Sequence, residues 1–270
     1  MPPRRPLAEE PAHLKALLYG DPDTGKTTAL AGMAHLGKVL YVVQEGGLRR
    51  RALRQLGIPV ENIERTTVTS YEDMQALVWD LRSKFDEDPD HLAGVCIDTL
   101  TALEQTFQEQ IMRDETAKAL RRHVIRDPFL MEGDDWGKNS SQMIRVLRDF
   151  RDLPCHVGYA SWSKRDVDDD TAEVVYRPMQ TPKVATLLLA YCDISVAMQP
   201  AWTTDRGAAT YWGITRRNGK WLGKDGFGVT PLRMPNPSFD RLVAYVNGDL
   251  TAKTDPEVKA FRAVRAGETK

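Results

Sequence analysis

The sequence of 270 residues has few cysteines, no long apolar run and no excess of charge of one sign. Its three cysteines are far apart, and none has the spacing of a disulfide framework or a metal site. We therefore expect small, buried, reduced thiols in a cytoplasmic protein. Because no stretch approaches the roughly eighteen apolar residues of a membrane span, we expect a soluble protein with no membrane partner.

The formal net charge is only -1, so no overall positive field draws in a nucleic acid. Any such contact must come from a local basic patch. Residues 1–12 are rich in proline and charge and lack the apolar stretch of a signal peptide, which predicts a flexible arm. With 41% hydrophobic residues, the rest of the chain can bury the core of one α/β domain.

Residues 20–28 read GDPDTGKTT, which fits the phosphate-binding pattern G-x-x-x-x-G-K-[ST]. The segment lies between an apolar run and a helical pattern, where backbone N–H groups and the helix dipole together bind phosphate. This pattern predicts nucleotide binding, with ATP and Mg²⁺ as cofactors. The predicted binding residues are Gly20, Asp21, Pro22, Asp23, Thr24, Gly25, Lys26, Thr27 and Thr28.

Three of these residues have distinct predicted roles. Lys26 reaches the β and γ phosphates as a mobile point charge. Thr27 offers its hydroxyl to Mg²⁺. Thr28 either contacts the α phosphate or is an ordinary helical threonine.

Strand and helix patterns alternate over the first 160 residues, which predicts a mainly parallel sheet with helices on both faces. Later strand patterns and the Asn218-Gly219 hairpin signal predict an antiparallel extension. We expect an ATPase domain over residues 13–235 and a helical tail over 236–270. Strands are predicted at 13–19, 38–43, 63–68, 93–97, 156–160, 193–198, 208–215 and 226–229, helices at 26–36, 48–56, 71–85, 101–126, 139–152 and 183–190, and a loop at 163–181.

Two carboxylates are candidates for the hydrolytic site. Asp98 ends the apolar strand of residues 93–97 and is expected to hold Mg²⁺ through water. Thr99 follows it, whereas many AAA-type ATPases have a catalytic glutamate there, so the base must come from elsewhere. Glu45 follows the strand of residues 38–43 and precedes two glycines, which resembles the RecA-like recombinases, where the corresponding acidic residue activates water. The alternative is a solvated glutamate at a strand end.

Together with the strand of residues 156–162, these motifs resemble the phage-encoded RecA-core ATPases, some of which act as single-strand annealing recombination proteins. The resemblance covers most of residues 13–232 and implies a RecA-like P-loop NTPase fold. It also implies that a polar residue after the sensor strand detects the γ phosphate. Ser161 is the first candidate for this role, and Ser163 is the second.

The resemblance further implies self-association into a ring or filament, in which a neighbouring subunit supplies cations to the nucleotide. Arg216, Arg217, Lys220 and Lys224 are candidates, unless they only form a solvated basic hairpin. Single-stranded DNA would contact the segments after the metal-binding and sensor strands, where cations alternate with aromatics but Asp166 opposes phosphate. The DNA-binding candidates are Arg121, Arg122, Lys164, Arg165, Arg177 and Lys183.

The leading interpretation is an ATP-hydrolysing protein that acts on single-stranded DNA in phage recombination, annealing or replication, in the host cytoplasm. Its further partners would be a single-strand-binding protein or replication proteins. A helicase-like motor or helicase loader shares the same core. A nucleotide-switched protein-interaction module with little turnover is the alternative from another class.

Overall fold

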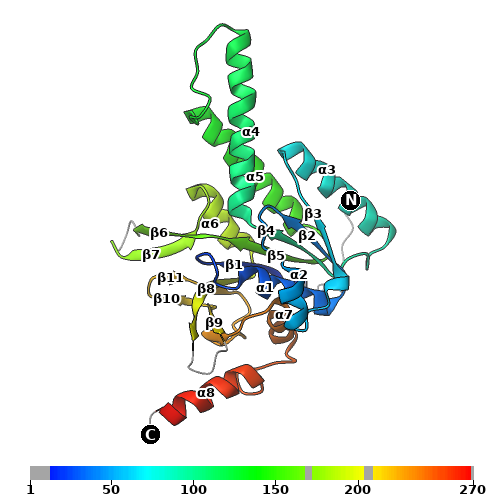
Figure 1. The fold of residues 1–270 in the computed structure, drawn as a ribbon, viewed down its shortest axis with the longest axis vertical. Helices are drawn as coiled ribbons and strands as arrows, with labels where there is room; N and C mark the ends of the chain where they lie inside the picture. The colour runs from blue at the N-terminus through cyan, green and yellow to red at the C-terminus, as the bar shows by residue number, and fades with distance from the viewer. Residues whose placement is uncertain (1–12, 168–171, 204–208, 269–270) are drawn as a thin grey trace, which may run out of the picture.

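The computed structural model describes residues 13–167, 172–203 and 209–268, so the predicted arm of residues 1–12 lies outside the described residues. The chain alternates strands and helices up to β5 and then turns mainly to strands (Figure 1). The elements are β1 (Lys15–Tyr19), α1 (Lys26–Ala31), η2 (Gly32–Leu36), β2 (Val39–Val43), α2 (Arg50–Gln55), η3 (Val60–Asn62), β3 (Ile63–Thr66), α3 (Tyr71–Glu87), β4 (Gly94–Asp98), α4 (Leu100–Arg121), α5 (Gly133–Arg151), β5 (His156–Ser161), β6 (Ser163–Val167), β7 (Val174–Pro178), α6 (Pro182–Tyr191), β8 (Ile194–Thr203), β9 (Ala209–Ile214), β10 (Arg217–Asn218), β11 (Trp221–Leu222), β12 (Lys224–Asp225), β13 (Arg233–Pro235), α7 (Phe239–Asn247) and α8 (Pro256–Glu268).

The main sheet has the strand order β13-β9-β8-β1-β5-β4-β2-β3, and β12 pairs with β8. Strands β3, β2, β4, β5, β1 and β8 run parallel, whereas β9, β12 and β13 add antiparallel pairs. A second sheet has the order β10-β11-β7-β6. The predicted α/β class, with a mainly parallel sheet and a late antiparallel extension, is therefore confirmed.

Alternate side chains of each central strand enter two different cores. In β1, Leu17 and Tyr19 pack into the core beneath α3, α4, α5 and α6, while Ala16 and Leu18 pack into the core with α1 and α7. This two-residue period is the ordinary geometry of a strand that is buried on both faces. Helices consequently cover both faces of the sheet.

The helix after the phosphate loop lies unusually close to the sheet. A Cβ added at Gly94 in β4 would lie 2.2 Å from the Met33 sulfur of η2 and 2.8 Å from the His156 carbonyl oxygen. Only glycine leaves room for this contact. The helix itself is shorter than the predicted 26–36, because it tightens into a 3-10 turn at Gly32.

Two other helix predictions need correction. The helix predicted over 101–126 ends at Arg121, and His123 then takes a left-handed backbone conformation with φ of 56°. The helix predicted from Asn139 begins earlier, at Gly133. Its first turn is fixed by Asp135, which accepts a hydrogen bond from the Glu132 backbone N–H at 2.9 Å.

Two predictions in the later chain were wrong. The predicted loop over 163–181 contains the antiparallel pair β6 and β7; the β6 sequence SKRDV lacks an apolar alternation because most of its side chains are at least partly exposed. The predicted strand 226–229 is instead a turn. The Asp225 carboxylate accepts backbone N–H bonds from Phe227 and Gly228 at 3.0 and 2.8 Å, and Gly228 has φ of 71°.

Two helical parts extend the fold beyond the sheet. Helix α7 buries Phe239, Leu242 and Tyr245 in the same core as α1, so the expected C-terminal tail begins with a helix that packs on the ATPase core. Helices α4 and α5 form an arm that projects from the sheet, at the opposite end of the molecule from α8 (Figure 1). No helix in the described ranges is long and apolar enough to cross a membrane.

The glycine contact makes a stability prediction. Gly94→Ala should lower the free energy of unfolding by about 1–3 kcal/mol, because the new methyl group overlaps Met33 and a backbone carbonyl. Gly137→Ala is the matched control, since Gly137 is exposed in α5 with no atom within 4 Å of the added Cβ. It should be neutral or stabilising by about 0.5–1 kcal/mol. Urea unfolding measures the change in the free energy of unfolding for both variants. Equal changes for Gly94→Ala and Gly137→Ala would contradict the prediction.

Candidate nucleotide site

The phosphate loop connects the end of β1 to the start of α1. Gly25 takes φ of 81° and Asp23 takes φ of 59°, so the loop uses the left-handed backbone conformations that turn N–H groups inward. A Cβ at Gly20 would lie 2.5 Å from the Met198 carbonyl oxygen, which makes glycine necessary there. The loop is thus shaped by its own glycines and by strand β8.

Lys26 lies inside the loop. Its Nζ donates to the carbonyl oxygens of Gly20 and Asp21 at 2.9 and 2.7 Å. Burial lowers the pKa of Lys26, while the nearby Asp98 and Glu45 carboxylates act in the opposite direction. A phosphate would offer this buried ammonium group a full negative charge in place of two neutral carbonyls.

Thr27 and Asp98 form a pair suited to Mg²⁺. Burial raises the pKa of the Asp98 carboxyl, and the neighbouring Thr27 hydroxyl acts in the opposite direction. A Cβ at Gly47 would lie 3.1 Å from Thr27 Oγ1 and 3.8 Å from Asp98 Oδ2, so this glycine leaves the space beside both oxygens open. Mg²⁺ is ordinarily held by one or two protein oxygens together with phosphate and water, which this pair fits.

Glu45 lies at the same edge of the sheet as Asp98. The Gln44 N–H donates to the Asp98 carbonyl at 2.9 Å and so ties the end of β2 to the end of β4. Thr99 Oγ1 donates to Glu45 Oε1 at 3.0 Å. Thr99, the residue after Asp98, therefore orients a glutamate supplied by the neighbouring strand.

A model of the AAA domain family matches residues 12–225, a span that contains the phosphate loop, Glu45 and Asp98. The chain belongs to the AAA domain family. Membership implies nucleotide binding of the P-loop ATPase type. A search of curated proteins found no match.

The two sensor candidates of this AAA domain have different surroundings. Ser161 is completely buried, and its hydroxyl bonds to the Trp162 carbonyl at 2.8 Å and to Gln180 Oε1 at 3.1 Å. Only its backbone reaches the loop, because its carbonyl accepts from Gly20 N at 3.2 Å. The hydroxyl of Ser163 instead bonds directly to the Asp21 carboxylate.

A buried polar network holds the base of the β6–β7 hairpin to helix α4. Thr101 Oγ1 accepts from Gln180 Nε2 at 3.2 Å and from Trp162 N at 3.0 Å. Glu104 accepts from the Thr181 hydroxyl at 2.9 Å, and burial raises its pKa. The network links the segments after β4, β5 and β7, so a shift at one of them is felt by the others.

The four candidate trans-acting cations differ in how strongly contacts within the chain hold their side chains. Lys224 Nζ donates to the carbonyl oxygens of Leu189, Ala190 and Cys192 at the end of α6, at 3.0, 3.1 and 2.6 Å. Arg216 donates to the Gly228 and Thr230 carbonyl oxygens in the segment after β12. Lys220 lies 5.2 Å from the Tyr176 ring centroid, and Arg217 pairs across β10 and β11 with Leu222. Contact with a neighbouring subunit stays a prediction for these residues.

The second sheet brings together residues from two predicted sets, the DNA-binding candidates and the trans-acting candidates. Lys164 pairs with Arg177, and Arg165 pairs with Tyr176, across β6 and β7. Tyr176 stacks on Trp221 with ring centroids 4.4 Å apart, and an ion pair joins Arg177 to Asp166 at 3.7 Å. Three DNA-binding candidates and the hairpin that carries Arg217 and Lys220 therefore share one sheet, whereas Lys224 lies on β12 in the main sheet. Lys183 lies nearby in the chain at the start of α6, whereas Arg121 and Arg122 lie at the far end of α4.

Some site residues had no signal in the sequence. Tyr211 of β9 covers the phosphate loop, since its ring would lie 3.0 Å from a Cβ added at Gly25. A single tyrosine in a late strand gives no sign, in the sequence, that its side chain covers the phosphate loop. The buried network of Thr101 and Gln180 likewise becomes visible only when the strands are assembled. The three cysteines, by contrast, are free and buried as predicted.

The open space at Gly47 makes a prediction about metal binding. Gly47→Ala should weaken Mg²⁺-dependent nucleotide binding by about tenfold or more, because the methyl group crowds the Thr27 and Asp98 oxygens. Gly46→Ala is the matched control, because nothing lies within 4 Å of its added Cβ. Calorimetric titration with ADP, with and without Mg²⁺, measures the effect. If Gly47→Ala and Gly46→Ala bind the nucleotide with equal affinity, Gly47 does not contribute to the metal site.

The contacts of Lys224 predict a structural role. Lys224→Met should lower the free energy of unfolding by about 1–3 kcal/mol, because three carbonyls at the end of α6 lose their donor. Lys220→Met, in the turn between β10 and β11, should change it by less than about 0.5 kcal/mol. Urea unfolding distinguishes the two. Unchanged stability with lower ATP hydrolysis would instead favour the trans-acting role of Lys224.

Proposed function

We propose that this AAA domain is a Mg²⁺-dependent, RecA-like ATPase that acts on single-stranded DNA in phage recombination, strand annealing or replication. The hydrogen bond between Ser163 and Asp21 carries the proposal. It connects the phosphate loop to the first residue of the β6–β7 hairpin, whose cations suit a nucleic acid. Work of this kind would take place in the host cytoplasm, beside a single-strand-binding protein or replication proteins.

The hydrolytic part of the proposal rests on the edge where β1, β2 and β4 end. Lys26 would neutralise charge on the β and γ phosphates, and Thr27 and Asp98 would hold Mg²⁺. Bound Mg²⁺ supplies charge neutralisation for the phosphates. Glu45, oriented by Thr99 at 3.0 Å, would accept the proton of the attacking water.

The coupling part of the proposal concerns Asp21. This residue supplies a carbonyl to Lys26 at 2.7 Å and a carboxylate to Ser163. A γ phosphate that draws Lys26 away from the Asp21 carbonyl would change both contacts together. The hairpin would then respond to the nucleotide through one hydrogen bond and through the network around Thr101.

The DNA-binding part of the proposal concerns the second sheet. Lys164, Arg165 and Arg177 lie on β6 and β7, and Lys220 lies over the stacked rings of Tyr176 and Trp221. Phosphates would pair with the cations, and bases would stack on the partly exposed side chains of Tyr176 and Trp221. A sheet of this composition favours a single strand over a duplex.

The proposal predicts hydrolysis that depends on DNA. Single-stranded DNA should raise the ATP hydrolysis rate several-fold, and Lys26→Ala should reduce that rate by about a thousandfold, since the phosphates lose their buried counter-charge. Ser163→Ala should retain the basal rate but lose most of the stimulation by DNA. Ser141→Ala, an exposed serine of α5, is the control and should behave like the wild type. A phosphate-release assay with and without a poly-dT oligonucleotide measures all four proteins.

The outcomes separate the alternatives. A rate that single-stranded DNA leaves unchanged would contradict the proposal. Displacement of a labelled strand from a duplex would favour the helicase-like motor. Nucleotide binding with little turnover, and a Glu45→Gln variant equal to the wild type, would favour the nucleotide-switched interaction module.

A further inference from the structure

The free end of the α4–α5 arm exposes large apolar side chains. We call residues 116–130 the arm tip. Ile125 is fully exposed, Phe129 is 89% exposed and Leu120 is 69% exposed. Val124 and Leu130 are also exposed. An exposed cluster of this kind is unusual on a lone soluble domain and marks an interaction surface.

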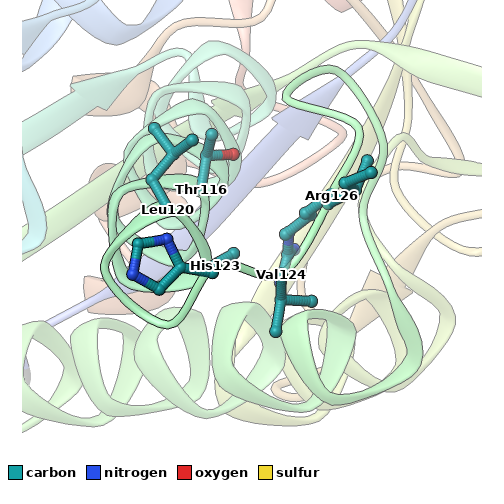
Figure 2. A pocket seen from close by; sticks show the side chains of 7 residues that line it. Thr116, Leu120, His123, Val124 and Arg126 are labelled. Atoms are coloured by element: carbon teal, nitrogen blue, oxygen red, sulfur yellow. The ribbon is translucent and has the colours of Figure 1, made fainter.

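The arm tip is also hollowed. A cavity of about 370 Å³ lies between the last turns of α4 and the loop that follows, and Thr116, Leu120, His123 and Val124 contribute to its walls (Figure 2). Arg126 reaches back from the loop and pairs with Asp135 of α5, which fixes the loop beside the helix. The hollow is therefore a formed feature of the arm.

The surroundings of this hollow are basic. The arm tip includes four cations, Lys118, Arg121, Arg122 and Arg126, and one acidic residue, Asp127. Lys118 and Arg126 have acidic partners within the arm. Arg121 and Arg122 are exposed and form no ion pair in the described part of the chain. The arm tip thus offers an apolar hollow with two unpaired guanidinium groups.

Helix α3 carries the opposite features. Trp79 is 68% exposed, on a stripe with the exposed residues Ala76 and Ser83. Beyond it, Asp86, Glu87, Asp88 and Asp90 are exposed, and none has an ion pair among the described residues. An exposed indole beside an unpaired acidic run is complementary to the hollow and cations of the arm tip.

These two surfaces cannot meet within one chain. Helix α3 is fastened to the base of the arm, where Tyr71 N donates to Gln110 Oε1 at 2.8 Å and Arg82 pairs with Asp149 at 2.8 Å. Helix α4 continues from Gln110 to Arg121, a further rise of about 16 Å, and carries the arm tip away from α3 (Figure 1). Each surface can therefore bind only another molecule.

We infer that the arm tip binds helix α3 of a second copy of this chain. Trp79 of one copy enters the hollow of the other, and Asp86 and Glu87 lie against Arg121 and Arg122. Because the two surfaces differ, the contact is heterologous and builds a ring or an open filament. This inference does not rest on ATP hydrolysis or on DNA binding, and it assigns Arg121 and Arg122 to a protein contact.

Two variants that each damage one surface test the inference. Trp79→Ala removes the inserted side chain, and Ile125→Asp places a charge at the hollow. Each should weaken assembly by about 30-fold or more, as loss of a tryptophan anchor does. Sedimentation velocity across a range of protein concentrations should show assemblies for the wild type and monomers for either variant alone.

A mixture of the two variants gives the decisive result. The intact arm tip of Trp79→Ala should bind the intact α3 of Ile125→Asp, and the mixture should form a one-to-one pair that grows no further. A mixture that stays monomeric, or a wild type that is monomeric throughout, would overturn the inference. Leu56→Asp is the control, because Leu56 is 62% exposed on another part of the molecule, and it should assemble like the wild type.

Charge reversal provides an independent check. Arg122→Glu and Asp86→Arg should each weaken assembly, and the double variant should recover it. A double variant no better than the single variants would contradict the pairing. Oligonucleotide anisotropy separates the alternative: if Arg122→Glu lowers DNA affinity and leaves assembly unchanged, the arm tip is a DNA surface and the inference is wrong. Thermal melts establish that each variant is folded.

Discussion

Strands β1, β5, β4 and β2 lie next to one another and all run in the same direction, so their carboxyl ends meet at one edge of the sheet. The position of every candidate catalytic side chain depends on this shared edge. The phosphate loop leaves β1, Glu45 follows β2, and Asp98 ends β4. The close approach of α1 and η2 to the sheet, which Gly94 permits, fixes the loop and Thr27 relative to those carboxylates.

Strand β5 lies between β1, which leads into the phosphate loop, and β4, which ends at Asp98, and this position gives the second sheet its importance. The chain leaves β5 at Ser161, contacts Asp21 through Ser163 and enters the β6–β7 hairpin at once. Few residues therefore separate the nucleotide site from a basic, aromatic surface. In the proposed coupling, the nucleotide changes the Asp21 contacts and so makes this short path the two-state element between the two surfaces.

The sequence predicted those parts of the fold that depend on local chemistry. The phosphate loop and the alternation of buried strands with helices each have a signal within a few residues, and the structure contains both. The β6–β7 hairpin gave no such signal, because β6 is polar and β7 pairs with β11, which is distant in the chain. The contacts of Ser163, Lys224 and Tyr211 join residues far apart in the chain, which no spacing pattern records.

The central claim is that the phosphate loop and the β6–β7 hairpin are coupled. Coupling between two binding sites is reciprocal, so each ligand must change the affinity for the other by the same factor. The most direct measurement is the dissociation constant of a non-hydrolysable ATP analogue, titrated with and without saturating single-stranded DNA, together with the converse titration. The account predicts equal factors of about five to 150 in the two directions. Analogue affinity that single-stranded DNA leaves unchanged, in a protein that binds both ligands, would contradict it.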